Sequence, residues 1–186
     1  CSGVFAFSSA EDCLLRLQLG RAPHPLSFAG RVVEEGTPVL YLHLWNEHLP
    51  PFPPSGPTLA WAKRAERLFL RSLQAVAEEI RRNPRLGAVR AVGGVTALFA
   101  PTSDSGGARF MQRLGFSVTP YRSPLGCFGA FWKNLYSSWL LWAYNPAAHR
   151  RGNPGRSSWS EAWMPVEEFL ARFGREPEEK GDLSFS

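Results

Sequence analysis

The side chains with the clearest potential for chemistry lie in residues 39–54, which read VLYLHLWNEHLPPFPP. In an extended strand, successive side chains point to opposite sides. Leucines then occupy one side, at positions 40, 42 and 44. The other side carries two aromatic rings, an imidazole and a carboxylate, from Tyr41, His43, Trp45 and Glu47. Because polar groups are costly to bury without partners, this side predicts either a ligand cleft or a satisfied polar network.

His43 and Glu47 are the pair that we predict to act in catalysis. Four residues apart on one strand face, they are separated by about 13 Å, which is too far for a direct hydrogen bond but suited to flanking a ligand. A structural network that includes Asn46 and His48 is the alternative. The order HxxxEH also differs from HExxH, which places metal ligands across a helical turn, so we expect no metal here. The chain also has no GxGxxG or GxxxxGK[ST] motif, and we expect no other cofactor.

A long helix is predicted over residues 59–82, with Thr58 as its N-cap and Asn83-Pro84 as its stop. Apolar side chains recur at helical spacing, at Phe69, Leu73, Val76 and Ile80. Basic side chains occupy another side of the same helix, where they form either a solvated face or a contact for phosphate or lipid headgroups. The ligand-binding residues that we predict are Tyr41, Trp45, Asn46, His48, Lys63, Arg64 and Arg67.

Before this helix, residues 10–19 predict a short helix that ends at Gly20. A strand then turns at Glu35-Gly36 and pairs in antiparallel fashion with the strand over residues 39–47. The four prolines after that strand remove ladder donors and end it.

After the long helix, Gly93-Gly94 interrupts a strand, where we expect a bulge or a close backbone approach. A helix closed by Gly115, a strand and a final helix between Pro165 and Gly174 follow. We therefore predict one α/β domain over residues 1–175, with a mostly antiparallel central sheet flanked by helices. Residues 176–186 are expected to form a flexible tail.

The composition favours an anionic partner. The chain has 186 residues, 44% of them hydrophobic, with a formal net charge of +5. Such a charge favours phosphorylated ligands, nucleic acid or an acidic membrane surface. We expect no nucleic acid, because the chain has no zinc-finger, helix-turn-helix or RNA-recognition signature. The three cysteines have no CxxC spacing, which argues against a zinc site and a complete disulfide framework.

A tryptophan-rich segment precedes a basic loop and predicts contact with a membrane surface. It contains Trp132, Trp139 and Trp142, and the loop contains Arg150 and Arg151. Tryptophan favours the membrane interface, and arginine is attracted to anionic lipid. Burial of these rings in the domain core is the alternative, and the one that we favour for the segment itself. Lysine and serine interrupt the apolar run, so we do not expect it to span a bilayer.

The chain is accordingly expected in the cytoplasm or at the periphery of a membrane. It begins at Cys1, followed by Ser-Gly, which fits either an artificial boundary or the first residues of a processed lipoprotein. We favour the artificial boundary.

Four segments together resemble the YkoP-like domain, which occurs in bacteria alone or attached to polysaccharide deacetylases. They read GTPVLYLHLWNEHLP, RAVGGVTALF, RFMQRLGFSVTPY and FWKNLYSSWLLWAYNP. The likeness covers roughly residues 14–146 and implies a context at the bacterial envelope. We therefore expect an envelope-associated domain that binds an anionic lipid-linked or glycan ligand near the membrane surface.

The order of the elements also resembles the core of the GNAT acyltransferases. Two strands, a proline loop, a long helix, a strand, the GGARFMQRLGF helix and a further strand follow one another as they do in that family. GNAT enzymes hold a cofactor pyrophosphate with a [QR]xxGx[GA] loop at the start of the long helix, where this chain reads PPSGPTLAWAKRA. The resemblance implies GNAT-like connectivity and, as the alternative function, a divergent acyltransferase.

Overall fold

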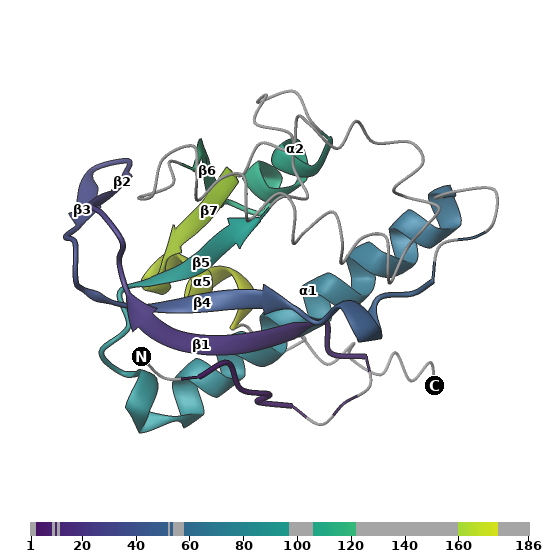
Figure 1. Cartoon of the computed structure of the whole chain (residues 1–186), viewed down its shortest axis with the longest axis horizontal. Helices are drawn as coiled ribbons and strands as arrows, with labels where there is room; N and C mark the ends of the chain where they lie inside the picture. The colour runs from purple at the N-terminus through teal and green to yellow at the C-terminus, as the bar shows by residue number, and fades with distance from the viewer. Residues whose placement is uncertain are drawn as a thin grey trace, which may run out of the picture.

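The structure is a computed structural model that describes residues 3–8, 10, 12–51, 53, 58–96, 106–121 and 160–174. Its centre is a five-stranded sheet in the order β1-β4-β5-β7-β6 (Figure 1). The strands are β1 (Leu15–Arg21), β4 (Pro38–Leu44), β5 (Ala91–Thr96), β7 (Ser160–Pro165) and β6 (Ser117–Pro120). Only β4 and β5 pair in parallel, so the sheet is mostly antiparallel, as predicted.

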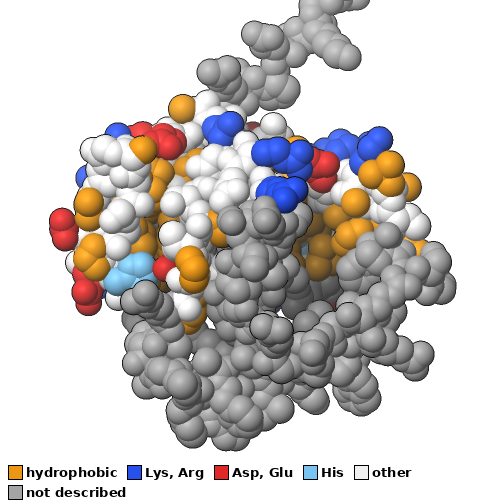
Figure 2. Space-filling model, turned by 90° about the horizontal axis from the view of Figure 1, so that it is seen from above, with side chains coloured by type: hydrophobic (Ala, Val, Ile, Leu, Met, Phe, Trp, Pro, Cys, Tyr) orange, Lys and Arg blue, Asp and Glu red, His pale blue; other side chains and the backbone are white. Residues whose placement is uncertain are grey.

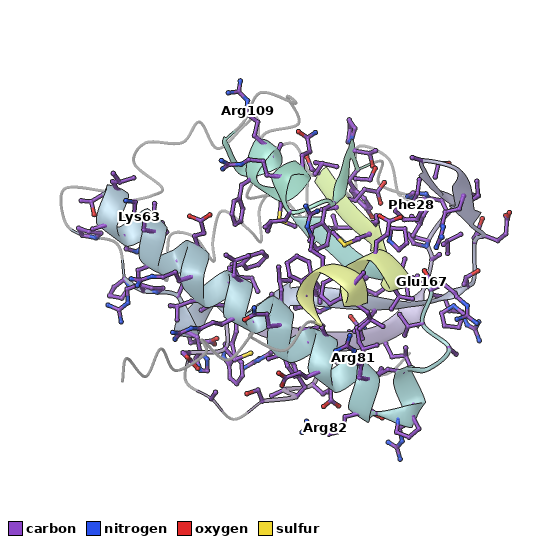
Figure 3. All side chains as sticks on the ribbon, turned by 180° about the vertical axis from the view of Figure 1, so that it is seen from behind. Phe28, Lys63, Arg81, Arg82, Arg109 and Glu167 are labelled. Atoms are coloured by element: carbon purple, nitrogen blue, oxygen red, sulfur yellow. The ribbon has the colours of Figure 1, made fainter. Side chains whose placement is uncertain are left out.

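Helices cover one face of this sheet. The long helix α1 (Leu59–Arg82) and the short helix α5 (Val166–Phe173) lie behind the strands in Figure 1 and in front of them in Figure 3. Their apolar side chains form the main core with the inward side chains of the strands, including Leu17, Leu40, Leu73, Val76, Val92, Met164 and Phe169. Helix α2 (Gly106–Arg113) adds Met111 to the same core. Burial of this apolar surface is the main contribution to stability.

A small hairpin packs on the opposite face of the sheet. Strands β2 (Leu26–Phe28) and β3 (Arg31–Val33) pair with each other, with Gly30 in the turn at φ 81°. Leu26 and Val33 meet Val39 and Trp163 in a second, smaller apolar cluster. The hairpin is also tied to α5 by an ion pair of 2.8 Å between Arg31 and Glu167. The second face is therefore apolar only where the hairpin covers it.

The prediction for the long helix is confirmed. It spans 24 residues, and the Thr58 hydroxyl accepts a hydrogen bond from the Trp61 backbone N–H. Asn83 ends it, and its side chain then accepts from the backbone N–H of Arg85 in the 3-10 turn η2 (Pro84–Leu86). This is a normal N-cap interaction for a polar side chain. The arginine Arg81, close to this end of the helix, donates to the carbonyl of Gly174 after α5.

Two expectations for the N-terminal part are wrong. Residues 15–19 are strand β1 and not helix, because the sequence LRLQL alternates apolar and polar side chains with a period of two. Strand β4 pairs with β1 over residues 15–21 and not with the strand immediately before it. The intervening residues instead form the β2–β3 hairpin, and Gly36 at φ 78° completes the turn into β4.

Two further strand boundaries differ from prediction. Strand β4 ends at Leu44, and Glu47 lies in the 3-10 turn η1 (Asn46–His48) instead of continuing the strand. The last predicted helix is preceded by strand β7, which the sequence analysis did not identify. The six side chains of β7 are all buried because the strand lies inside the sheet, so no polar alternation marks it.

Strand β5 makes the close backbone approach that its two glycines predict. A Cβ atom on Gly93 would lie 2.1 Å from the carbonyl oxygen of Ala162 and 2.7 Å from the Trp163 ring. A Cβ atom on Gly94 would lie 2.9 Å from the carbonyl oxygen of Leu42. The glycines therefore allow β5 to fit between β4 and β7.

Replacing Gly93 by Ala should destabilise the domain strongly. The added methyl group would overlap β7 backbone that cannot move without disturbing the sheet, a cost of about 1–3 kcal/mol or more. Gly3→Ala is the matched control, because no atom lies within 4 Å of a Cβ at that position. Denaturant unfolding of the two variants measures the difference, and equal stabilities would contradict the close approach.

Candidate functional site

The candidate site lies on the second sheet face, next to the hairpin and in part beneath it. Polar and aromatic side chains from three strands and the residue after β4 share this face, which we call the polar face. They are Arg16 and Gln18 from β1, Tyr41, His43 and Trp45 from β4 and its end, and Glu161 and Trp163 from β7. The alternation predicted for residues 40–45 is thus confirmed, with leucines toward α1 and the polar row on the other side.

His43 is the half-buried imidazole at the middle of this row. Its Nε2 lies 2.9 Å from Oε1 of Gln18 on the neighbouring strand. Burial lowers the pKa of His43 below its ordinary value, so the ring is neutral near pH 7. With the Nε2 proton donated to Gln18, Nδ1 carries a lone pair and makes no hydrogen bond within the described part of the chain. This arrangement can accept a proton from a ligand.

Trp45 lies beside His43 and contacts two other side chains. The guanidinium carbon of Arg16 is 3.8 Å from the centre of the indole. The ring of His48 stacks on the same indole, with centroids 3.9 Å apart and planes 14° apart. Nδ1 of His48 in turn donates to the carbonyl oxygen of Cys13 at 2.8 Å. The indole is therefore held in place by a cation and an imidazole.

Tyr41 connects the row to strand β7. Its ring meets Trp163 edge to face at 5.1 Å, across the strand that carries Gly93. Its hydroxyl donates to the carbonyl oxygen of Arg21 at 3.0 Å. Burial, followed by the nearby Tyr121 and Glu161, raises the pKa of Tyr41, so the phenol remains protonated at neutral pH.

Glu161 places a buried carboxylate on the same face, with only 4% of its surface exposed. It accepts hydrogen bonds from Trp163 Nε1 at 3.1 Å and from the Thr119 hydroxyl at 3.4 Å. Nε2 of His24 lies 3.0 Å from the same carboxylate. This charge is therefore compensated, as a buried carboxylate requires.

His24 brings the connection between β1 and β2 onto this carboxylate. Its Nδ1 donates to the carbonyl oxygen of Pro25 at 3.0 Å, so both ring nitrogens face acceptors. The hydrogen bond to Pro25 and the charge of Glu161 raise the pKa of His24, although partial burial opposes them. The doubly protonated ring fits both contacts best.

The structure does not bring all the predicted site residues together. Glu47 is exposed in η1, outside the row that contains His43. The side chain of Asn46 lies outside the described part. Lys63, Arg64 and Arg67 lie on the exposed side of α1, and α1 covers the other face of the sheet. The predicted ligand-binding residues thus form two groups on opposite sides of the sheet.

Trp132, Trp139, Trp142, Arg150 and Arg151 lie outside the described residues, as do residues 176–186. No helix in the described ranges is long and apolar enough to cross a membrane.

Sequence reasoning missed several members of the polar face. Arg16 and Gln18 were assigned to a helix, although the alternation in LRLQL would have placed them on one strand face. His24 and Glu161 are 137 residues apart in the chain, and no local pattern connects them. Their contact depends on β7 lying between β5 and β6.

Comparison with known families identifies one match. The family model of the YkoP domain matches residues 24–173. This range includes β4, both glycines of β5 and all of β7. Neither the curated proteins nor the solved structures gave a match.

Replacing His24 by Gln should change how stability depends on pH. Because the folded pKa of His24 is raised above 6.5, its pairing with Glu161 stabilises the fold fully below about pH 6.5. This contribution is lost as the pH rises through the raised folded value. The stability difference between the wild type and His24→Gln should therefore shrink with rising pH.

Denaturant unfolding between about pH 5.5 and 8.5 measures this difference. His43 acts in the opposite direction, because its lowered pKa reduces stability as the pH falls below 6.5. That effect is present in both proteins and cancels in the comparison. A stability difference that does not vary with pH would contradict the His24–Glu161 linkage.

Proposed function

The chain belongs to the YkoP domain family, and we propose that it binds an anionic lipid-linked or glycan ligand at the bacterial envelope, on the polar face of its sheet. The observation that carries this proposal is the half-buried row of Tyr41, His43 and Trp45. Core strands normally bury apolar side chains on both faces when both are covered. A row of aromatic and hydrogen-bonding groups instead matches the lining of ligand sites.

The charges on this face support an anionic ligand. The buried carboxylate of this face, on Glu161, is already engaged by His24, Thr119 and Trp163. The guanidinium of Arg16 makes no ion pair among the described residues. Aromatic rings beside a cation suit a ligand with a charged group and an apolar or sugar-ring surface.

The basic stripe of α1 supports proximity to an anionic surface. Lys63, Arg64 and Arg67 are exposed and have no carboxylate partner in the described part of the chain, whereas Arg71 pairs with Asp12 at 3.7 Å. Figure 3 shows Lys63 near the beginning of α1, far from Arg81 and Arg82 at its other end. Figure 2, a view from above that does not identify α1, shows several basic side chains at the upper right with an acidic one among them, and most other acidic side chains at the left. Such a distribution attracts acidic lipid at long range.

A divergent acyltransferase is the second candidate, and the strand arrangement favours it. The order β1-β4-β5-β7-β6 and the parallel β4–β5 pair support the GNAT-like connectivity that the sequence suggests. Strands β4 and β5 pair only over residues 39–41 and 91–93 and then separate toward their ends (Figure 1). In this candidate function, an extended ligand adds its own hydrogen bonds to the strand edges that do not pair with each other in the described part of the chain. His43, neutral and next to this separation, would then accept the proton of the attacking group.

We expect the protein to bind acidic vesicles through the basic stripe. Phosphatidylglycerol–phosphatidylcholine vesicles should sediment it at about 0.1 M salt, and binding should weaken at about 1 M, where the Debye length falls from about 10 Å to about 3 Å. The triple variant Lys63→Gln, Arg64→Gln and Arg67→Gln should reduce sedimentation. The control variant Arg85→Gln, Arg90→Gln and Arg113→Gln removes equal charge from other exposed positions.

If both triple variants lost vesicle binding equally, the binding would depend on net charge alone and not on the basic stripe of α1. Protein that remains in the supernatant at low salt would contradict contact with an anionic lipid surface.

We expect no saturable binding of acetyl-CoA. The chain ahead of α1 contains Pro53, Pro54 and Pro57, which lack the N–H groups that would hold a pyrophosphate. Isothermal titration calorimetry of the full chain measures this directly. Acetyl-CoA that bound one-to-one and excluded the lipid or glycan ligand would favour the acyltransferase over the first proposal. The same would follow if His43→Gln kept that binding, because His43 would then act on the bound substrate and not in holding acetyl-CoA.

A further inference from the structure

Arg16 occupies a distinctive position on the polar face. It lies directly opposite His43 in the β1–β4 register, and Gln18 follows it on the same face of β1. Its guanidinium carbon is 3.8 Å from the centre of the Trp45 ring. A cation stacked on an indole is held in one orientation without a carboxylate.

Several other described arginines have polar partners that neutralise their charge or accept their hydrogen bonds. Arg31 pairs with Glu167 at 2.8 Å, and Arg82 pairs with Glu79 at 2.8 Å. Arg21 donates to the carbonyl oxygen of Gly36 at 2.8 Å. Arg16 has no such contact among the residues that the structure describes, and its Nε is buried without a hydrogen-bond partner. Buried donors are almost always paired, so this one requires an explanation.

Arg16 makes no ion pair with a carboxylate in the described ranges of the chain. Its register partner His43 has a lowered pKa and is neutral near pH 7, and Gln18 is uncharged. Glu161 lies on β7, separated from β1 by β4 and β5, and its carboxylate is bound by His24 and Trp163. A guanidinium that is fixed by stacking, with donors left over, is prepared to bind an anion from outside the chain.

We infer that Arg16 binds the anionic group of the ligand through two oxygens on one edge of a phosphate or carboxylate. Trp45 holds the guanidinium plane, and His43 lies next to the bound anion. This inference rests on the proposed function and deepens it, because it assigns the charge recognition to β1 and not to the basic stripe of α1. Phosphate would come from a lipid-linked ligand, and carboxylate from an acidic glycan.

Calorimetry with farnesyl phosphate, glucuronate and inorganic phosphate tests this assignment on the full chain. Arg16→Gln should weaken binding of the preferred probe about tenfold or more, because a charge-assisted bidentate contact is lost. Arg16→Lys keeps the charge but not the planar donor pair, so it should recover only part of the affinity. Arg85→Gln is the control that removes one exposed charge elsewhere, and Arg64→Gln tests whether the basic stripe of α1 recognises the anion instead.

Two spectroscopic readouts separate binding from folding. In the wild type, the Nε–H resonance of Arg16 should shift when a probe that binds is added. This readout does not depend on whether Arg16→Gln folds as stably as the wild type. The pKa of His43, followed by its ring resonances, should rise on binding because a nearby negative charge favours the protonated ring. An unshifted Arg16 signal at saturation with a bound probe would overturn the assignment.

The outcomes distinguish this inference from the proposed function. If the wild type binds a probe and Arg16→Gln binds it equally well, the Arg16 assignment fails and the proposed function stands. If Arg64→Gln alone loses binding, the basic stripe recognises the anion and the assignment again fails. If the wild type binds none of the probes, the proposed function itself fails. Binding of farnesyl phosphate identifies the lipid-linked source, and binding of glucuronate identifies the glycan source.

Discussion

The close fit of β5 between β4 and β7 is the constraint on which the polar face depends. Gly93 has no side chain, so the rings of Tyr41 and Trp163 can meet across the strand at 5.1 Å. This contact joins the β1–β4 part of the face to the carboxylate of Glu161 on β7. Any larger residue at this position would separate the two parts, because its Cβ would occupy space that Ala162 and Trp163 already fill.

The sheet also separates the basic stripe of α1 from the polar row on β4, although the two segments lie close in the sequence. Because α1 crosses the apolar face, the cations at its exposed side point away from the row on β4. The first turn of α1 is nevertheless fixed near the end of β4, where Trp61 Nε1 donates to the carbonyl oxygen of Pro50 at 2.9 Å. In the proposed function, the exposed surface of α1 attracts anionic surroundings and the polar face binds a single ligand.

The two charged groups on the polar face, Glu161 and Arg16, differ in whether their hydrogen-bonding atoms have partners. Glu161 is buried and receives hydrogen bonds from three side chains, which is the usual condition for a stable buried carboxylate. Arg16 is stacked on Trp45 but has a buried donor without a partner. Satisfied polar groups stabilise and orient a fold, whereas unsatisfied groups in a native structure are found where strain or ligand contact serves function.

Local sequence patterns determined much of this structure before any tertiary contact is considered. The cap at Thr58, the stop at Asn83 and the apolar spacing between them define α1, because capping and helical periodicity depend on neighbours a few residues apart. The alternation of residues 40–45 likewise separates the apolar side of β4 from its polar side. Gly93-Gly94 indicates a close approach, but the sequence does not identify which strands approach.

Tertiary structure alone decided the strand order and therefore the composition of the candidate site. The local pattern paired β4 with the segment before it, but β4 pairs with β1 because that pairing places both leucine rows against α1. Strand β7 is buried on both faces and has no alternation, so neither it nor Glu161 could be located from residue spacing. Contacts such as His24–Glu161 join residues from opposite ends of the chain, and their geometry exists only once the sheet has assembled.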